Sequence, residues 1–394
     1  MNDDIIFDVE TTTSNKGNPF DRTNKMVVMG TLNKYGTYVC TWSNFDWKSL
    51  KEMYLVGHNI KFDLHWARRS GVDITGISVW DTQLAEFILT GQVHRFPSLN
   101  ECLEKRGMSL KLDVVKTKYW DLAIDTDSIP RDILQSYLEK DLDATNRLYQ
   151  SQKKQFETTH AHLYPLFKLH CKDLLVLQEM EWNGILYNEQ KALDKVKEIE
   201  REQAKIEYKL DQIVGAIPYS LSSDADISSI VYGGVILKES RIPIGVFTTG
   251  KKVGQTRYKV VYNAYECEGM VVPLKGTEVK TKVSQKELDF VEKKILNCPR
   301  KYWSVDEKTL KKVKAKKAAR EFIDLYQAHN KIEKLRSTGL MGCINTIKEL
   351  NLEPNHLHPS LNQCVAITGR LSSSKPNGQN MDETTKRFCE SRYT

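Results

Sequence analysis

The stretch "IIFDVETTT", residues 5–13, places an aspartate and a glutamate two positions apart, directly after an apolar run. Its β-branched and aromatic residues predict a strand, on which alternate side chains share one face. The apolar residues would then point into a core, while Asp8 and Glu10 point together the other way. Two carboxylates about 4 Å apart repel by roughly 1–4 kcal/mol. Such a pair is typical either of a strand end in water or of a charged site.

A second stretch, "LVGHNIKFDLHWARR" at residues 55–69, predicts a strand that ends near His58 and leads into a helix. Asn59 and Asp63 are four residues apart, which is about one helical turn, so they share a face of that helix. Taken alone, the two residues fit two interpretations equally well: part of a functional site, or a helix cap followed by a surface aspartate.

The third stretch, "ILQSYLEKDLDATNRLY" at residues 133–149, has the apolar spacing of an amphipathic helix. Tyr137 and Asp141 lie one turn apart at the edge of its apolar stripe, whereas Asp143 projects away from it. An aspartate next to a buried face is costly unless something compensates its charge. This position therefore favours a functional carboxylate.

Together the three stretches predict one pocket lined by four carboxylates and a tyrosine. Its residues are Asp8, Glu10, Asp63, Asp141 and Tyr137. At neutral pH such a cluster needs cations, and hard oxygen ligands suit Mg²⁺ or Mn²⁺. Two such ions about 4 Å apart hold the attacking and leaving oxygens of a phosphodiester in line.

The composition indicates a globular protein of two or three domains, since 394 residues exceed one typical core. Eight scattered cysteines without a CxxC pair indicate reduced thiols. The H-x-H pairs at residues 160–162 and 356–358 lack nearby partner ligands, so we expect no metal there. No apolar run approaches a membrane span and the first residues are acidic, so we expect a cytoplasmic location.

Charge is unevenly distributed along the chain. Residues 1–150 hold 18 Lys and Arg against 21 Asp and Glu, and the remainder holds 40 against 30. The run at residues 300–320 carries nine basic and two acidic residues. Such a run is typical of a solvated helix face and also suits a nucleic-acid backbone.

The three acidic stretches, D-x-E, N-x-x-x-D and Y-x-x-x-D in this order, resemble the motifs of the DEDD superfamily of 3′→5′ proofreading exonucleases in its tyrosine form. The resemblance implies a ribonuclease H-like α/β domain with a mixed central sheet and flanking helices. It also implies that the four carboxylates hold two divalent metal ions, while Tyr137 orients the attacking water. Asp81, in "WDTQLAEFIL", is expected to be structural. The residues expected to contact the terminal nucleotides are Thr11, Asn59, Lys61 and Phe62.

The pattern after residue 155 is mainly helical, with one β-rich interruption. Residues 235–283 are β-branched, aromatic and punctuated by turns, which predicts a strand-rich insertion. "SSDADISSIVYGG" predicts a short capped helix that ends at glycines. Ser304 and Glu307 have the spacing of a capping box for the helix that follows.

Near the end, "TGRLSSSKPNGQN" at residues 368–380 resembles the segment that family A DNA polymerases carry between thumb and palm. The segments "MEWNGILYN", "YWSVDEKTLKKV" and "KIEKLRSTGLMGCI" resemble the thumb of that family, in the same order, and the insertion is more similar to phage members. Gly378 and Met381-Asp382 depart from the family pattern. The resemblance implies contacts with primer–template DNA from Thr368, Arg370, Ser372, Ser373, Gln379 and Asn380.

The resemblance implies three regions: an exonuclease domain at 1–155, a thumb-like region at 156–350 and the start of a palm at 351–394. The catalytic motifs of the family's palm are not found in this sequence. We therefore expect a split or truncated polymerase whose palm and fingers reside on a second chain, in the bacterial cytoplasm if it is phage-encoded. The alternatives are a stand-alone 3′→5′ ribonuclease and a non-catalytic subunit that holds DNA.

Overall fold

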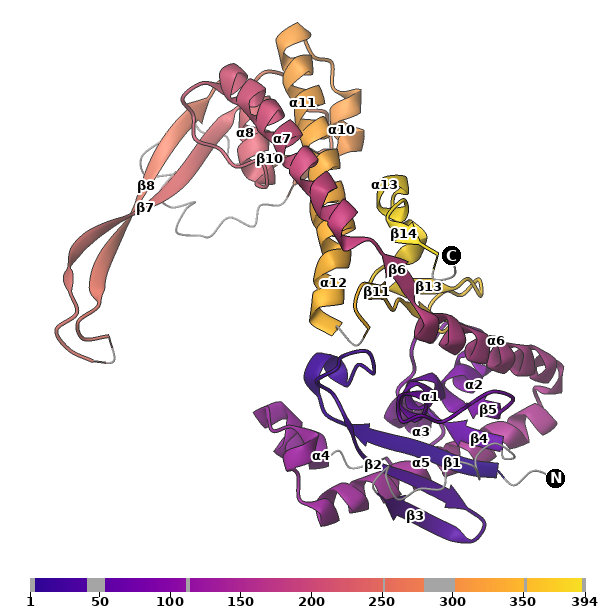
Figure 1. The fold of residues 1–394 in the computed structure, drawn as a ribbon. Coiled ribbons are helices and arrows are strands. Elements are labelled where there is room, and N and C mark those ends of the chain that lie inside the picture. Colours follow the sequence, from indigo (N-terminus) through magenta and orange to yellow (C-terminus); the bar gives the residue numbers. More distant parts are fainter. Residues whose placement is uncertain are drawn as a thin grey trace. The chain divides into compact units, whose positions relative to one another are not determined.

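The computed structural model describes residues 4–40, 54–110, 114–250, 252–279, 302–350 and 353–391. The chain forms two compact units: unit 1 comprises residues 1–193 and 339–394, and unit 2 comprises residues 194–338. Unit 1 carries all the predicted site residues. Figure 1 shows both units as ribbons.

A five-stranded mixed sheet forms the centre of unit 1, in the order β3-β2-β1-β4-β5. β1 pairs antiparallel with β2 and parallel with β4, while β3 and β5 form the edges. The strands are β1 (Asp4–Thr11), β2 (Met26–Asn33), β3 (Gly36–Cys40), β4 (Tyr54–Gly57) and β5 (Ser78–Asp81).

Helices cover this sheet and enclose one apolar core. They are α1 (Ile60–Arg69), α2 (Thr82–Leu89), α3 (Leu99–Lys105), α4 (Val114–Lys118), α5 (Arg131–Glu157) and α6 (Tyr164–Asn183). Short 3₁₀ turns occupy Ser14–Lys16, Trp120–Leu122, Thr126–Ser128 and Ala161–Leu163. Trp66, Trp80 and Phe167 are among the fully buried side chains of this core. The predicted α/β class is confirmed.

The C-terminal part of unit 1 adds two small sheets. β6 (Ile185–Tyr187) lies between β11 (His356–Leu357) and β14 (Cys389–Glu390), and β12 (Ser360–Asn362) pairs with β13 (Ser372–Ser374). The helical elements here are α12 (Gly342–Leu350), a 3₁₀ turn at Gly378–Asn380 and α13 (Glu383–Lys386). The pairing of β12 with β13 fixes the base of the predicted DNA-holding segment.

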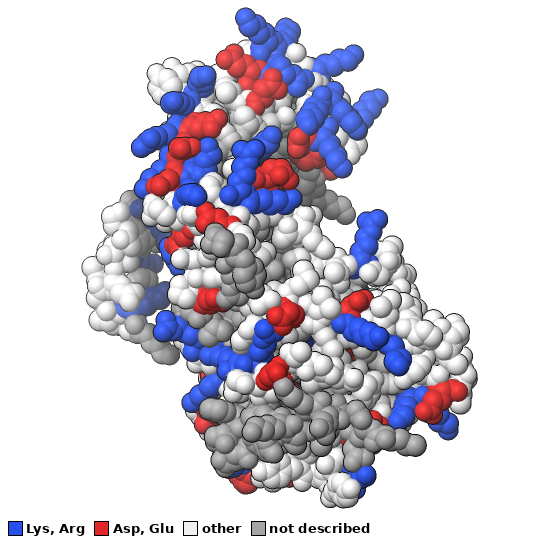
Figure 2. All heavy atoms as spheres, turned by 45° about the vertical axis from the view of Figure 1, so that its right-hand side comes forward, with Lys and Arg blue, Asp and Glu red and all other residues white. Residues whose placement is uncertain are grey.

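Unit 2 is helical, with a long hairpin. Its elements are most of α7 (Glu189–Val214), α8 (Asp224–Tyr232), β7 (Gly234–Val246), β8 (Thr256–Cys267), β9 (Glu278–Val279), β10 (Tyr302–Trp303), α10 (Glu307–Lys312) and α11 (Lys317–Lys334), followed by a π-helical turn at Leu335–Met341. Figure 2 shows Lys and Arg side chains gathered over its helices, with Asp and Glu among them. The strand-rich insertion is confirmed by β7 and β8.

Two predicted helix starts have different outcomes. The hydroxyl of Ser223 caps α8 by accepting a hydrogen bond from the Asp226 amide, as expected. The predicted Ser304 and Glu307 capping box is wrong, because Asp306 is the N-cap of α10 and accepts from the Thr309 amide at 2.8 Å. Ser304 donates its hydroxyl to Asp306, so it supports the cap from outside the helix.

Two chain-wide predictions can be compared with the structure. The seven cysteines within the described residues are all free thiols, and Cys298 lies outside those residues. Among the helices of the described part, none has both the length and the apolar character needed to cross a bilayer.

Candidate nuclease site

Strand β1 positions two of the predicted carboxylates. Its apolar residues Ile5, Phe7 and Val9 are buried in the core of unit 1. The side chains of Asp8 and Glu10 alternate with them and lie together on the other face, as the period of two predicts. Glu10 is nonetheless only 8% exposed, which shows that this face is also covered.

Helix α5 brings the third carboxylate to this face. Asp8 is the cross-strand partner of Gly30 in β2. A Cβ at Gly30 would lie 2.7 Å from Leu142 and 3.1 Å from Leu138, so α5 packs against the sheet where that side chain is missing. This close approach places the neighbouring Asp141 beside β1. Sequence analysis did not identify Gly30, and its only signal is a glycine within an apolar strand.

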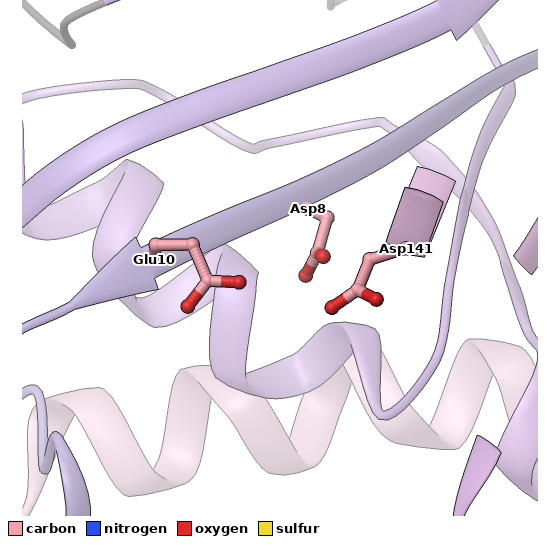
Figure 3. A group of neighbouring side chains, drawn as sticks. All are labelled: Asp8, Glu10 and Asp141. Carbon is pink, nitrogen blue, oxygen red and sulfur yellow. The ribbon is translucent and has the colours of Figure 1, made fainter. Parts of the chain in front are cut away.

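The carboxylates of Asp8, Glu10 and Asp141 converge in Figure 3, and one oxygen from each lies within 4.8 Å of the others. Like charges at this distance repel, particularly at buried positions. An oxygen-only donor set of this kind suits a hard divalent cation. Among the described residues this is the only group of three or more possible metal ligands, and neither H-x-H pair belongs to one.

Asp63 adjoins this cluster through the backbone of β1. The pairing of β4 with β1 covers Asp4 to Ile6. Farther along, the Val9 amide donates to Asp63 Oδ1 at 3.2 Å and to Asp8 Oδ1 at 3.1 Å. Burial and then the charge of Asp8 raise the pKa of Asp63 well above its usual range. The structure thus places Asp63 next to Asp8 but outside the group whose oxygens meet within 4.8 Å.

Asp81 is buried nearby and acts as a structural cap. Its carboxylate accepts from the Leu84 amide at 2.9 Å, which caps α2, and from the Ile60 amide at 2.9 Å at the start of α1. One side chain therefore fixes the N-termini of two helices. The Asn59 amide lies 3.4 Å from the same carboxylate, so Asp81 also holds the turn that leads into α1.

Tyr137 lies one turn before Asp141 on the buried face of α5 and is only 6% exposed. Its ring packs edge to face against Trp120, with the ring centres 5.9 Å apart. The Trp120 indole donates to Thr126 at 3.1 Å. The next residue back, Asp125, accepts from the Thr13 amide at 2.8 Å, which connects this segment to the end of β1.

The predicted nucleotide contacts Thr11, Asn59 and Phe62 differ in exposure. Asn59 is exposed and has a left-handed backbone (φ 62°), whereas Thr11 is buried and Phe62 is partly buried. The last two surround Gly17, where a Cβ would lie 2.4 Å from the Thr11 hydroxyl and 3.4 Å from the Phe62 ring. Because Gly17 also has a φ of 69°, another residue there would be both strained and crowded.

Lys61 does not have the environment expected of a DNA contact. Its side chain is 14% exposed, and its ammonium lies 2.5 Å from both Glu181 Oε1 and the carbonyl oxygen of Leu361. The same glutamate oxygen accepts from the Leu361 amide at 2.5 Å. This geometry does not support the predicted contact between Lys61 and DNA, because the cation is already engaged inside unit 1.

The other oxygen of Glu181 binds His65 Nε2 at 2.7 Å. Gln178 donates to His65 Nδ1 at 3.2 Å, so the ring is a neutral tautomer that donates from Nε2. Burial would raise the pKa of Glu181, but the His65 hydrogen bond and the Lys61 charge outweigh it and hold the pKa below its usual range. Glu181 therefore ties α1 to α6 and β12.

The segment after β12 presents most of its predicted DNA contacts to solvent. Thr368, Arg370, Gln379 and Asn380 are exposed, and Ser372 is partly exposed. Ser373 differs, because it is 5% exposed and its hydroxyl accepts from the Gly378 amide at 3.2 Å. That hydroxyl also donates to the Pro376 carbonyl at 3.2 Å. The predicted DNA contact of Ser373 is therefore not supported, since the hydroxyl holds a turn.

Comparisons with known proteins agree with this geometry. The 3′-5′ exonuclease family model matches residues 2–157, and the DNA polymerase family A model matches residues 247–393. A DNA polymerase of Bacillus phage SP01 is 25% identical over 84% of this chain and 34% of its own length. DNA polymerase I of Synechocystis is 24% identical over 82% of this chain and 26% of its own length.

A solved structure gives the same assignment of fold. The POL domain of Pol1 from M. smegmatis, in complex with DNA primer-template and dNTP, matches 98% of this chain and 54% of its own chain. The TM-score is 0.61 at 14% sequence identity. The chain spans about a third or less of the curated relatives it matches. On the two matched regions together, the chain belongs to the family A DNA polymerases and contains their 3′-5′ exonuclease domain and part of the polymerase domain.

Proposed function

We propose that this chain removes nucleotides from the 3′ end of DNA by metal-dependent phosphodiester hydrolysis. The observation that carries the proposal is the meeting of three carboxylates within 4.8 Å, from β1 and α5, inside the region matched by the exonuclease family. We assign this activity to residues 1–155, and DNA holding to a thumb-like region at 156–350 and a palm start at 351–394.

The metal ligands would be Asp8, Glu10 and Asp141, with Asp63 completing a site for two Mg²⁺ or Mn²⁺ ions. Bound cations would supply Lewis-acid stabilisation of the phosphate and a nucleophilic water at neutral pH. The acidic residues would hold these ions, and the shared Val9 amide fixes Asp63 and Asp8 side by side. Tyr137, steadied by Trp120, would orient the attacking water.

DNA would be held at two places in unit 1. Asn59 and Phe62, at the start of α1, are positioned to contact the last nucleotides, because Asp63 follows them on the same helix. Thr368, Arg370, Ser372, Gln379 and Asn380 would contact the backbone and groove of primer–template DNA without reading its sequence. Their exposure and the match to the polymerase family support this role.

The first test is digestion of 5′-labelled single-stranded DNA in Mg²⁺ by wild type and Asp8→Ala. A ladder that shortens from the 3′ end, absent in the variant, is expected. A parallel reaction with RNA of the same sequence tests the ribonuclease alternative, which predicts faster loss of RNA. DNA that is bound but remains intact with both proteins would contradict the nuclease proposal and favour a DNA-holding role.

We further propose that polymerisation requires palm and fingers segments supplied by a second chain. The relatives support the need for further segments, because each extends well beyond the region that this chain matches. Mixing this chain with a palm-and-fingers chain should give a stable complex that extends a primer. A mixture that neither associates nor extends would contradict the second-chain proposal.

A further inference from the structure

The β7–β8 hairpin extends far beyond the core of unit 2. Its two strands contain 13 and 12 residues and pair from Gly234 with Cys267 out to Val246 with Thr256. Val235 and Ile236 at its base are buried, whereas every residue from 241 to 246 and from 256 to 260 is exposed. Figure 1 shows this outer half as an isolated two-stranded ribbon. An isolated pair of strands is marginally stable, so an exposed one of this length indicates a contact surface.

In the outer hairpin, which we define as residues 240–260, every charged residue is a Lys or Arg. It contains five Lys and Arg and no Asp or Glu. Arg241 forms an ion pair with Glu239 at 3.1 Å, just inside this segment. Within the described part of the chain, Arg257 and Lys259 have no acidic partner. These two cations are therefore available to a ligand.

One face of the ribbon combines charge with apolar surface, and the other face presents an aromatic ring. Lys259 lies opposite Ile242, and Arg257 shares its face because it is two residues away on the same strand. On the other face Tyr258 lies opposite Pro243. Ile242 is 50% exposed and Tyr258 is 52% exposed. Cations that alternate along a strand with an exposed aromatic residue are typical of nucleic-acid-binding segments.

We propose that the outer hairpin binds the phosphate backbone of double-stranded DNA and so adds a contact to those of the polymerase fold. The proposal rests on the proposed DNA-holding function. Charge decides the choice of ligand, since a segment with five cations and no anion is complementary to a polyanion. Arg257 and Lys259 each bind one phosphate, and the register of β8 places them on the same face.

The test is the salt dependence of DNA binding by the full chain. Affinity for a labelled duplex is measured over a series of salt concentrations, with EDTA to prevent cleavage. Each phosphate contact contributes about 0.9 to the slope of log K against log salt. The double variant Arg257→Ser and Lys259→Ser should therefore lower the magnitude of the slope by roughly 2. Both positions are exposed, so the fold should be retained, as circular dichroism would verify.

The matched control is Lys195→Ser with Lys197→Ser on α7. It removes the same charge from unit 2, where the half-buried Lys195 pairs with Glu198 and the exposed Lys197 pairs with Asp194. Because both lysines are already paired with an acidic neighbour, this variant should change the slope less than the hairpin variant does. If wild type binds duplex DNA and the hairpin variant has the wild-type slope, the inference is wrong and the apolar hairpin residues point to a protein partner. If wild type does not bind duplex DNA, the proposed DNA-holding function itself fails.

Discussion

Two buried carboxylates of unit 1, Asp63 and Glu181, are each only 3% exposed, yet their pKa values shift in opposite directions. Burial acts on both in the same sense, by penalising the charged form. The charges that act on Asp63 belong to Asp8 and Asp81, and both are negative. Glu181 instead meets Lys61 and a hydrogen-bonded His65. The structural acid Glu181 is thus compensated by charges of the protein itself, whereas we expect the acids of the candidate nuclease site to be compensated by bound cations.

The sharpest test of this contrast is Asp141→Asn, which removes one member of the acidic cluster. We expect the exonuclease rate to fall by about 10²- to 10⁴-fold, because Lewis-acid stabilisation is worth several kcal/mol. Stability in metal-free buffer should be unchanged or higher, because a like-charge repulsion is removed. Single-turnover digestion and thermal melting measure the two effects.

Asp143→Asn is the matched control, since Asp143 lies on the same helix with a 63% exposed side chain that pairs with Arg147. Its rate should remain within about twofold of wild type, because an exposed ion pair contributes only about 0–1 kcal/mol. Equal losses of exonuclease rate in Asp141→Asn and Asp143→Asn would show that the loss reflects a general disturbance of α5 and not removal of a site carboxylate.

The converse test is Glu181→Gln, which leaves Lys61 charged and without its carboxylate. Breaking a buried ion pair costs about 3–5 kcal/mol, so the free energy of unfolding of unit 1 should fall by this amount. Because Glu181 is outside the acidic cluster, the folded protein should keep most of its exonuclease rate. Urea denaturation followed by circular dichroism measures the loss of stability. Exonuclease rates measured at urea concentrations well below the unfolding midpoint then show the effect on activity separately.

Glu179→Gln, on the same helix, provides the control for that measurement. Glu179 pairs with Arg68 but its side chain is 53% exposed, so its loss should cost less than about 1 kcal/mol. If Glu181→Gln were as stable as this control but lacked activity, Glu181 would belong to the site and the contrast between the two carboxylates would be wrong.

Tyr137→Phe should have a smaller effect than loss of a carboxylate. It removes one hydroxyl while leaving the ring against Trp120. A hydrogen bond to a charged group is worth about 1.5–3 kcal/mol, so the rate should fall by about 10- to 100-fold with stability nearly unchanged. A variant with the wild-type rate in single-turnover digestion would exclude a role of the hydroxyl in orienting the water.

The site could be predicted from sequence where the residues that determine it are close along the chain. The alternation in β1 is sufficient to place Asp8 with Glu10, and helical spacing is sufficient to place Tyr137 with Asp141. The roles of Lys61 and Gly30 could not be predicted in this way. Lys61 points inward because it binds Glu181 and Leu361. These partners lie 120 and 300 residues away in sequence, so no local pattern predicts the contact. Gly30 matters only because α5 packs over it.

Short local motifs were less reliable than these patterns. Ser304 has the spacing of a cap, yet Asp306 provides it, because the helix starts two residues later than the motif predicts. Ser373 stands in a segment expected to bind DNA, but its hydroxyl is needed for the turn at Gly378. In both cases the role of a polar side chain depends on which backbone amide lies beside it in the fold. The local sequence motif alone does not show which amide that is.

The smallest predicted effect is the pH dependence of the Glu181 contribution. A carboxyl group whose folded pKa is lowered stabilises the protein above its unfolded pKa, about 4.3, and this contribution is lost as the pH falls through the folded value. The stability difference between wild type and Glu181→Gln should therefore change little from pH 7 to 5 and shrink below about pH 4.3. Urea midpoints of both proteins across this range measure it. A difference that grows on acidification would mean that the folded pKa is raised, as it is for Asp63, and the two carboxylates would no longer differ in kind.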